Sequence, residues 1–126
     1  MSRRTERVNF TLRRELGALI SEELNDPRLA QITSVTHVDV SPDLKTARVY
    51  ISVLGDDAEK AASMEALESA AGLLRNALRD RIRIRYTPSL RFLPDTTIEA
   101  GAEMLALIDQ VADEDRRRGL RDDEAS

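Results

Sequence analysis

The sequence predicts one α+β domain in which helices cover one face of a three-stranded sheet. Apolar residues recur at helical spacing at both ends of the chain, and between them the apolar period falls to two, as in strands. A length of 126 residues suits a single core. No repeat or linker divides the chain. The predicted order of elements is helix, strand, strand, kinked helix, strand, helix.

The first predicted helix covers residues 5–24. Its apolar residues fall three and four positions apart, which places them on one face. They are Val8, Leu12, Leu16, Leu19, Ile20 and Leu24. The helix is expected to end at Asn25-Asp26-Pro27, because a proline disfavours a helical residue before it and cannot continue the hydrogen-bond ladder.

Residues 32–54 predict an antiparallel hairpin. Val38 and Val40 alternate with polar residues, and the same alternation returns from Ala47 to Val53. Ser41-Pro42-Asp43 between them is typical of a reverse turn, in which proline presets the first corner.

A second helical pattern begins near Ala58 and continues through Gly72, to end before Pro88. A glycine inside a helix costs about 1 kcal/mol relative to alanine, which favours a kink or a close backbone approach there. Leu90 and Phe92 predict a third short strand.

A last helix is expected from about Thr96 through Val111. The sequence after Ala112 is charged and nearly free of apolar residues. It predicts a folded domain over residues 1–112 and, over residues 113–126, a charged tail in which a solvated helix end runs into disorder.

Charge is distributed unevenly along a chain whose formal net charge is −4. Two arginine blocks stand apart from the acidic remainder and predict one basic face and one acidic face. The first block is Arg3, Arg4, Arg7, Arg13 and Arg14, and the second is Arg75, Arg79, Arg81, Arg83, Arg85 and Arg91. If the segment after the kinked helix is extended, Arg81, Arg83 and Arg85 project together.

No catalytic, metal-binding or cofactor-binding pattern is present. The chain has no cysteine and a single histidine, His37. Because His37 falls in a predicted strand, we expect it to have a structural role and not to act as a catalytic base. Glycine-rich nucleotide-binding motifs are missing. We therefore expect no small-molecule substrate. The apolar runs are too short for a bilayer, so a cytoplasmic protein without a membrane partner is predicted.

The arginine blocks predict RNA binding. Arginine contacts phosphate bidentately, and an aromatic content of only 3% favours recognition of backbone and shape over base stacking. The alternative is that these arginines pair with neighbouring acids, and that the chain is an acidic protein–protein adaptor without RNA contact. A hydrolase working through carboxylates is a weaker alternative that no spacing supports.

Several blocks taken together resemble the ribosome-binding factor A family over roughly residues 3–112. They are Asn25-Asp26-Pro27-Arg28-Leu29, the hairpin ITSVTHVDVSPDLKTARVYISVLG, AAGLLRNAL, RIRYTPSLRFLPD and Thr97-Ile98-Glu99-Ala100-Gly101. The resemblance implies a type II KH-like domain with an extra C-terminal helix. In it, an Ala-x-Gly kink, here Ala70-Ala71-Gly72, replaces the GxxG loop of other KH modules.

The resemblance also implies a function. Members of the family are bacterial assembly factors that bind the immature small ribosomal subunit and its 16S rRNA near the neck and the 5′-terminal helix. They support late maturation and 5′-end processing, especially in the cold, and then dissociate. For this chain we expect a monomer without enzymatic activity. The resemblance leaves open whether other assembly factors bind directly.

Overall fold

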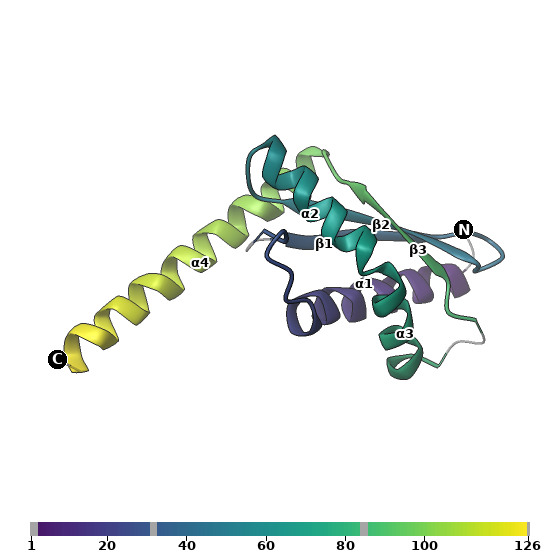
Figure 1. Cartoon of the computed structure of the whole chain (residues 1–126), viewed down its shortest axis with the longest axis horizontal. Coiled ribbons are helices and arrows are strands. Elements are labelled where there is room, and N and C mark those ends of the chain that lie inside the picture. The colour runs from purple at the N-terminus through teal and green to yellow at the C-terminus, as the bar shows by residue number, and fades with distance from the viewer. Residues whose placement is uncertain (1–2, 31–32, 84–85, 126) are drawn as a thin grey trace.

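The structure, a computed structural model, describes residues 3–30, 33–83 and 86–125. Figure 1 shows the elements, which follow one another in the predicted order. They are α1 (Arg3–Glu23), β1 (Thr33–Val40), β2 (Thr46–Val53), α2 (Asp57–Ser69), α3 (Ala71–Arg81), β3 (Ser89–Pro94) and α4 (Ile98–Ala125). The α+β class predicted from apolar periodicity is confirmed.

The sheet has the order β1-β2-β3. β1 and β2 form the predicted antiparallel hairpin, whose turn is closed by a 2.8 Å hydrogen bond from the Ser41 N–H to the Thr46 carbonyl. β3 runs parallel to β2, since the chain crosses over through α2 and α3 before it returns to the sheet. The parallel pairing places Arg91 beside Arg48.

The core lies between one face of the sheet and the helices α1, α2 and α3. Alternate strand residues meet the apolar stripe of α1 and the inner faces of α2 and α3. The cluster includes Leu12, Leu16, Leu19, Val38, Val49, Ile51, Leu67, Leu74, Leu78 and Phe92. The strand residues between these carry polar or aromatic side chains, among them His37, whose ring centroid lies 5.7 Å from that of Tyr50. His37 is exposed and belongs to no metal-binding cluster among the described residues.

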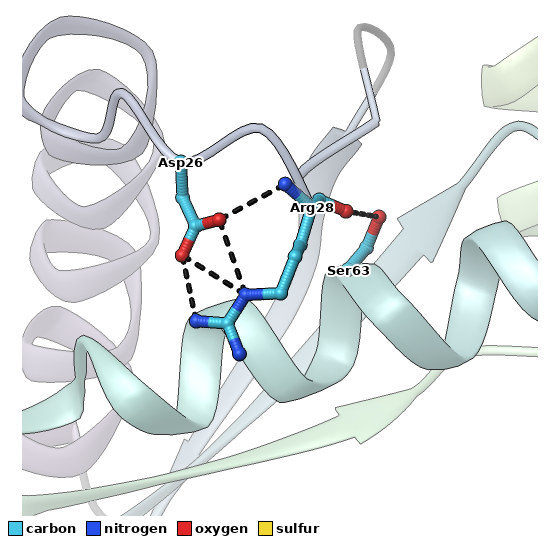
Figure 2. Close-up of polar contacts among 3 residues, drawn as sticks. All are labelled: Asp26, Arg28 and Ser63. Atoms are coloured by element: carbon cyan, nitrogen blue, oxygen red, sulfur yellow. Dashed lines mark hydrogen bonds and ion pairs between the residues drawn. The ribbon is translucent and has the colours of Figure 1, made fainter.

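The connection from α1 to β1 is held by side chains (Figure 2). Asp26 accepts hydrogen bonds from the backbone N–H of Arg28 at 2.9 Å and from the Arg28 guanidinium, the shortest at 2.7 Å. The guanidinium bond is the main reason that the pKa of Asp26 lies below its ordinary value. The Ser63 hydroxyl on α2, fully buried, accepts from the Ala30 N–H at 2.9 Å and donates to the Arg28 carbonyl at 3.4 Å. This connection is therefore anchored to α2.

The predicted kink falls at Ala70. Its φ of −91° and ψ of 0° depart from the helical values of about −63° and −42° and turn the chain between α2 and α3. The Ala70 N–H still donates to the Ala66 carbonyl at 3.1 Å, and its carbonyl accepts from the Leu74 N–H at 2.9 Å. A Cβ built on Gly72 meets no atom within 4 Å. Of the two interpretations of Gly72, a kink or a close backbone approach, the described residues show the kink, which lies at Ala70 within Ala70-Ala71-Gly72.

Helix α4 continues beyond the predicted boundary at Ala112 to Ala125 and projects from the body of the molecule (Figure 1). The backbone is helical over residues for which the sequence predicts a helix end followed by a disordered tail. A lack of apolar residues does not end a helix when the segment contains no proline and offers ion pairs between successive turns, such as Arg116 with Asp113. The division of the chain into a domain over 1–112 and a tail over 113–126 stays a prediction.

Candidate nucleic-acid interface

The arginines of the first block lie along the exposed side of α1. Arg3, Arg7 and Arg14 recur at three- and four-residue steps together with Phe10, so the four share one stripe. All four are exposed, whereas the opposite face of the helix is buried in the core. Arg4 and Arg13 are also exposed but lie outside this stripe. Cations at a helix start oppose the macrodipole, so this placement does not serve the stability of the helix.

A groove of about 290 Å³ brings two arginines of each block together. Arg7 and Arg14 line it from α1, and Arg81 and Arg83 line it from the end of α3 and the residues that follow. Its floor is partly apolar, with Val8, Leu12 and Ile82. Residues far apart in the chain therefore present guanidinium groups around one concave surface, an arrangement that suits a ribose-phosphate backbone.

Arg81 in this groove is already paired. Its Nη2 lies 2.7 Å from Oε2 of Glu22, and its Nη1 lies 3.3 Å from Oε2 of Glu15. The hydrogen bond to Glu22 is the main cause that raises the pKa of Arg81 above its ordinary value. Arg81 thus joins α3 to α1. Arg83 is exposed, and the described part of the chain gives it no hydrogen bond or ion pair.

The other arginines of the second block lie elsewhere. Arg75 donates from Nε and Nη2 to the Thr87 carbonyl at 3.1 and 3.0 Å, which ties α3 to the segment before β3. Arg79 is exposed on α3 and donates to Oδ1 of Asn76 at 3.3 Å. Both therefore lie on the helical layer, and Arg75 has a structural role that the charge pattern does not reveal.

Arg91 belongs to a different surface. Its strand neighbours Leu90 and Phe92 are buried in the core, so Arg91 points to the face of the sheet away from that core. Beside it, Arg48 forms a 2.6 Å ion pair with Asp39. The predicted arginines thus occupy more than one face. Arg85, the remaining member of the set, lies outside the described residues, so the predicted projection of Arg81, Arg83 and Arg85 together is not described.

Two candidate residues do not follow from the charge pattern. Phe10 is 65% exposed, and Arg48 is exposed on the sheet face beside Arg91, where it is paired with Asp39. The sequence does contain a signal for Phe10, because it falls off the apolar stripe of α1 and onto the arginine stripe at helical spacing. Arg48 alternates with core residues of β2, which also marks it as outward-facing.

Other kinds of site find little support in the described residues. Histidine and carboxylate side chains nowhere gather there in a group of three or more that could hold a metal ion. No helix in the described ranges has the length and apolarity needed to cross a membrane. A second hollow, of about 430 Å³, lies where α4 meets the end of β2 and is lined by Leu54, Met64 and Leu105 among others. It contains no arginine among the residues that the structure describes.

Comparison with known proteins gives a consistent result. The sequence model of the family described as ribosome-binding factor A matches residues 4–108. Ribosome-binding factor A of Acetivibrio thermocellus is 42% identical over 121 residues, which cover 96% of this chain and 97% of the relative. The Pseudomonas paraeruginosa protein of the same name is 47% identical over 118 residues, covering 92% and 91%.

Solved structures agree. The crystal structure of ribosome-binding factor A from Thermus thermophilus has a TM-score of 0.65 and 32% identity, covering 71% of this chain and 93% of the other. A homology model of the Thermus thermophilus factor, fitted into a cryo-electron microscopy map of a complex of 30S with ribosome-binding factor A, has a TM-score of 0.58 and 34% identity, covering 68% and 88%. The KH-like α+β fold predicted from the resemblance is confirmed, and the chain belongs to the ribosome-binding factor A family.

Proposed function

We propose that this protein is a cytoplasmic assembly factor that binds the immature 30S subunit as a monomer, without enzymatic activity. On this proposal it contacts 16S rRNA near the neck and the 5′-terminal helix, promotes late maturation and 5′-end processing, especially in the cold, and then dissociates. The folded domain over residues 1–112 provides the RNA contact. Family membership and the fitted Thermus thermophilus relative support the partner.

The observation that carries the proposal is the groove between α1 and the end of α3. Arg7, Arg14 and Arg83 surround it, while Arg81 fixes its walls through Glu15 and Glu22. A protein that neutralises phosphates with arginine releases counterions from the RNA, so its binding weakens as salt rises. Arg3, Arg4 and Arg13 on α1 and Arg79 on α3 are exposed outside the groove and are further candidate phosphate contacts.

The bend at Ala70 has a place in this proposal. It sets the angle between α2 and α3 and thereby the position of Arg79, Arg81 and Arg83 relative to α1. Ala71 and Gly72 form the first turn of α3; Ala71 packs against the core, and Gly72 is exposed, with no atom within 4 Å of a Cβ built on it.

Sedimentation of a lysate from cells that produce the chain tests the partner. We expect co-migration with free small subunits and absence from full ribosomes. Growth of a strain that lacks the gene should slow in the cold, with precursor 16S rRNA accumulating. A protein that stays in the soluble fraction contradicts the proposal. Binding that survives removal of RNA but disappears when residues 113–126 are deleted supports the adaptor alternative instead.

A further inference from the structure

Phe10 is an exposed aromatic ring in the midst of arginines. The side chain is 65% exposed, and it projects from the side of α1 opposite the buried leucines. The chain contains only two phenylalanines, and the other, Phe92, is buried in the core. Phe10 therefore contributes little to the packing that α1 makes with the sheet. Exposing its apolar ring to water is unfavourable in free energy and is not offset by packing.

The surroundings of the ring are cationic. The guanidinium carbon of Arg14 lies 6.0 Å from the ring centroid, within the range of a cation–π contact. Phe10 also borders an open hollow of about 580 Å³, together with Arg3, Glu6, Arg7 and Thr11. One guanidinium group therefore lies over the ring, and two more share its hollow with the carboxylate of Glu6.

We propose that Phe10 is a stacking platform for one unpaired RNA base, with Arg3, Arg7 and Arg14 binding the phosphates on either side of that nucleotide. Every base offers a π face that an aromatic side chain can stack on, and arginines beside the ring suit the backbone that carries the base. The inference rests on the proposed RNA-binding function and adds to it a single-stranded contact, which the low aromatic content of the chain does not predict.

A protein partner fits this surface less well. A docking protein needs a contiguous apolar patch, and Phe10 is the one large hydrophobic side chain exposed on the described residues of α1. A lone ring bordered by three cations offers little apolar area, whereas it matches the alternation of flat base and anionic phosphate in a single strand.

The test uses the full chain with two probes, single-stranded oligoadenylate RNA and a blunt RNA duplex. Stacking on one aromatic side chain is worth about 5- to 150-fold in affinity, so Phe10→Ala should weaken binding of the single strand by a factor in this range. It should leave the affinity for the duplex and the slope of affinity against salt unchanged, because every arginine that binds phosphate remains. Leu105→Ala, an equally exposed side chain on α4, is the matched control and should change neither affinity.

A second variant gives a direct signal. The chain has no tryptophan, so Phe10→Trp introduces a single tryptophan, which can be excited apart from the two tyrosines, at the proposed platform. Its fluorescence should fall on addition of the single strand and stay constant with the duplex, while affinity for the single strand is retained.

The outcomes separate this inference from the proposed function. If Phe10→Ala binds both probes as the parent does, and the Phe10→Trp signal does not respond, the stacking platform is refuted while 30S binding stands. If Phe10→Ala binds 30S more weakly but oligoadenylate equally, the ring contacts another part of the subunit and the inference is wrong. If the parent chain binds neither 30S nor RNA, the proposed function fails first.

Discussion

Arg81, the last residue of α3, donates from Nη2 to Oε2 of Glu22 on α1 at 2.7 Å. The same guanidinium also donates from Nη1 to Glu15, which lies on α1 as well, at 3.3 Å. A member of the basic block is thereby committed to joining two helices, and both acids come from the region predicted to form an acidic face. The groove keeps its positive character through Arg7, Arg14 and Arg83.

Arg81→Gln should lower the Tm slightly, because an exposed ion-pair network contributes little compared with core packing. The fall should disappear when Arg81→Gln is made in a chain that already carries Glu15→Gln and Glu22→Gln, since the partners are then gone. Arg83→Gln, at the same groove, should leave the Tm unchanged. An equal fall in both backgrounds would show that the three side chains do not interact. Thermal unfolding followed by circular dichroism compares these variants with the parent.

Leu73 and Leu74 are neighbours in sequence with opposite environments. Leu74 is fully buried in the core and Leu73 is 58% exposed. Leu74→Ala should therefore cost about 2–5 kcal/mol of unfolding free energy, through reduced burial and the cavity left behind. Leu73→Ala should change it by less than about 0.5 kcal/mol. Urea denaturation compares the two, and similar costs would contradict the described orientation of α3.

Gly72→Ala should stabilise the protein by about 0.5–1 kcal/mol, because the residue lies in α3 and a Cβ there meets no atom within 4 Å. The midpoint of urea denaturation measures the gain. A fall in stability would mean that the backbone at this position cannot be that of a regular helix. Weaker 30S binding by the stabilised variant would show that the partner approaches the backbone at Gly72.

Asp95 connects three elements. Its Oδ2 accepts from the Thr36 hydroxyl on β1 at 2.5 Å, and its Oδ1 accepts from the Thr97 N–H before α4 at 3.0 Å. The Thr36 bond is the main cause that lowers the pKa of Asp95 below its ordinary value of 3.8. Because the folded state binds this proton less readily than the unfolded state, the stabilisation is complete above the ordinary pKa and is lost as the pH falls through the lower folded pKa.

Asp95→Asn should therefore destabilise the protein at neutral pH and flatten the decline of stability below about pH 4. Thermal unfolding between neutral and acidic pH compares the variant with the parent. Asp57→Asn, at an exposed position in the first turn of α2, is the control for removal of a carboxylate. A parallel decline in parent and Asp95→Asn would contradict the assigned role of these hydrogen bonds.

The elements can be predicted from the sequence because their signals are local. Pro27 limits the first helix, the alternation through Val49 and Ile51 marks a strand, and the turn at Pro42 favours a hairpin. Helix propensity alone places the bend near Gly72, whereas the resemblance to an Ala-x-Gly kink at Ala70-Ala71-Gly72 includes Ala70, where the backbone turns.

The length of α4 is harder to predict, because a charged segment without apolar residues is typical of disorder. The same charges can form ion pairs between successive turns of a helix, as Arg116 does with Asp113. Composition therefore does not distinguish a solvated helix from a disordered tail after Ala112.

The candidate site is harder to predict from the sequence than the elements are, because it depends on which helices pack against each other. Charge alone identifies the two arginine blocks but not that Arg7 and Arg83 share a groove, since this needs the packing of α3 against α1. Nor can it separate Arg83 from Arg75 and Arg81, whose guanidinium groups are engaged by the Thr87 carbonyl and by Glu22. Arg91 falls on the other face of the sheet for a reason visible in the sequence, its alternation with buried strand residues.

The claim that the groove between α1 and α3 holds RNA is tested most directly by titrating 30S subunits at increasing salt with the double variant Arg7→Glu/Arg83→Glu. Its matched control is Arg116→Glu/Arg117→Glu, which makes the same charge change on exposed residues of α4. We predict weaker binding and a log–log salt slope flatter by about 0.7–0.9 for each phosphate that the variant no longer neutralises, with the control close to the parent. Unchanged affinity and slope in a folded Arg7→Glu/Arg83→Glu protein would contradict the account.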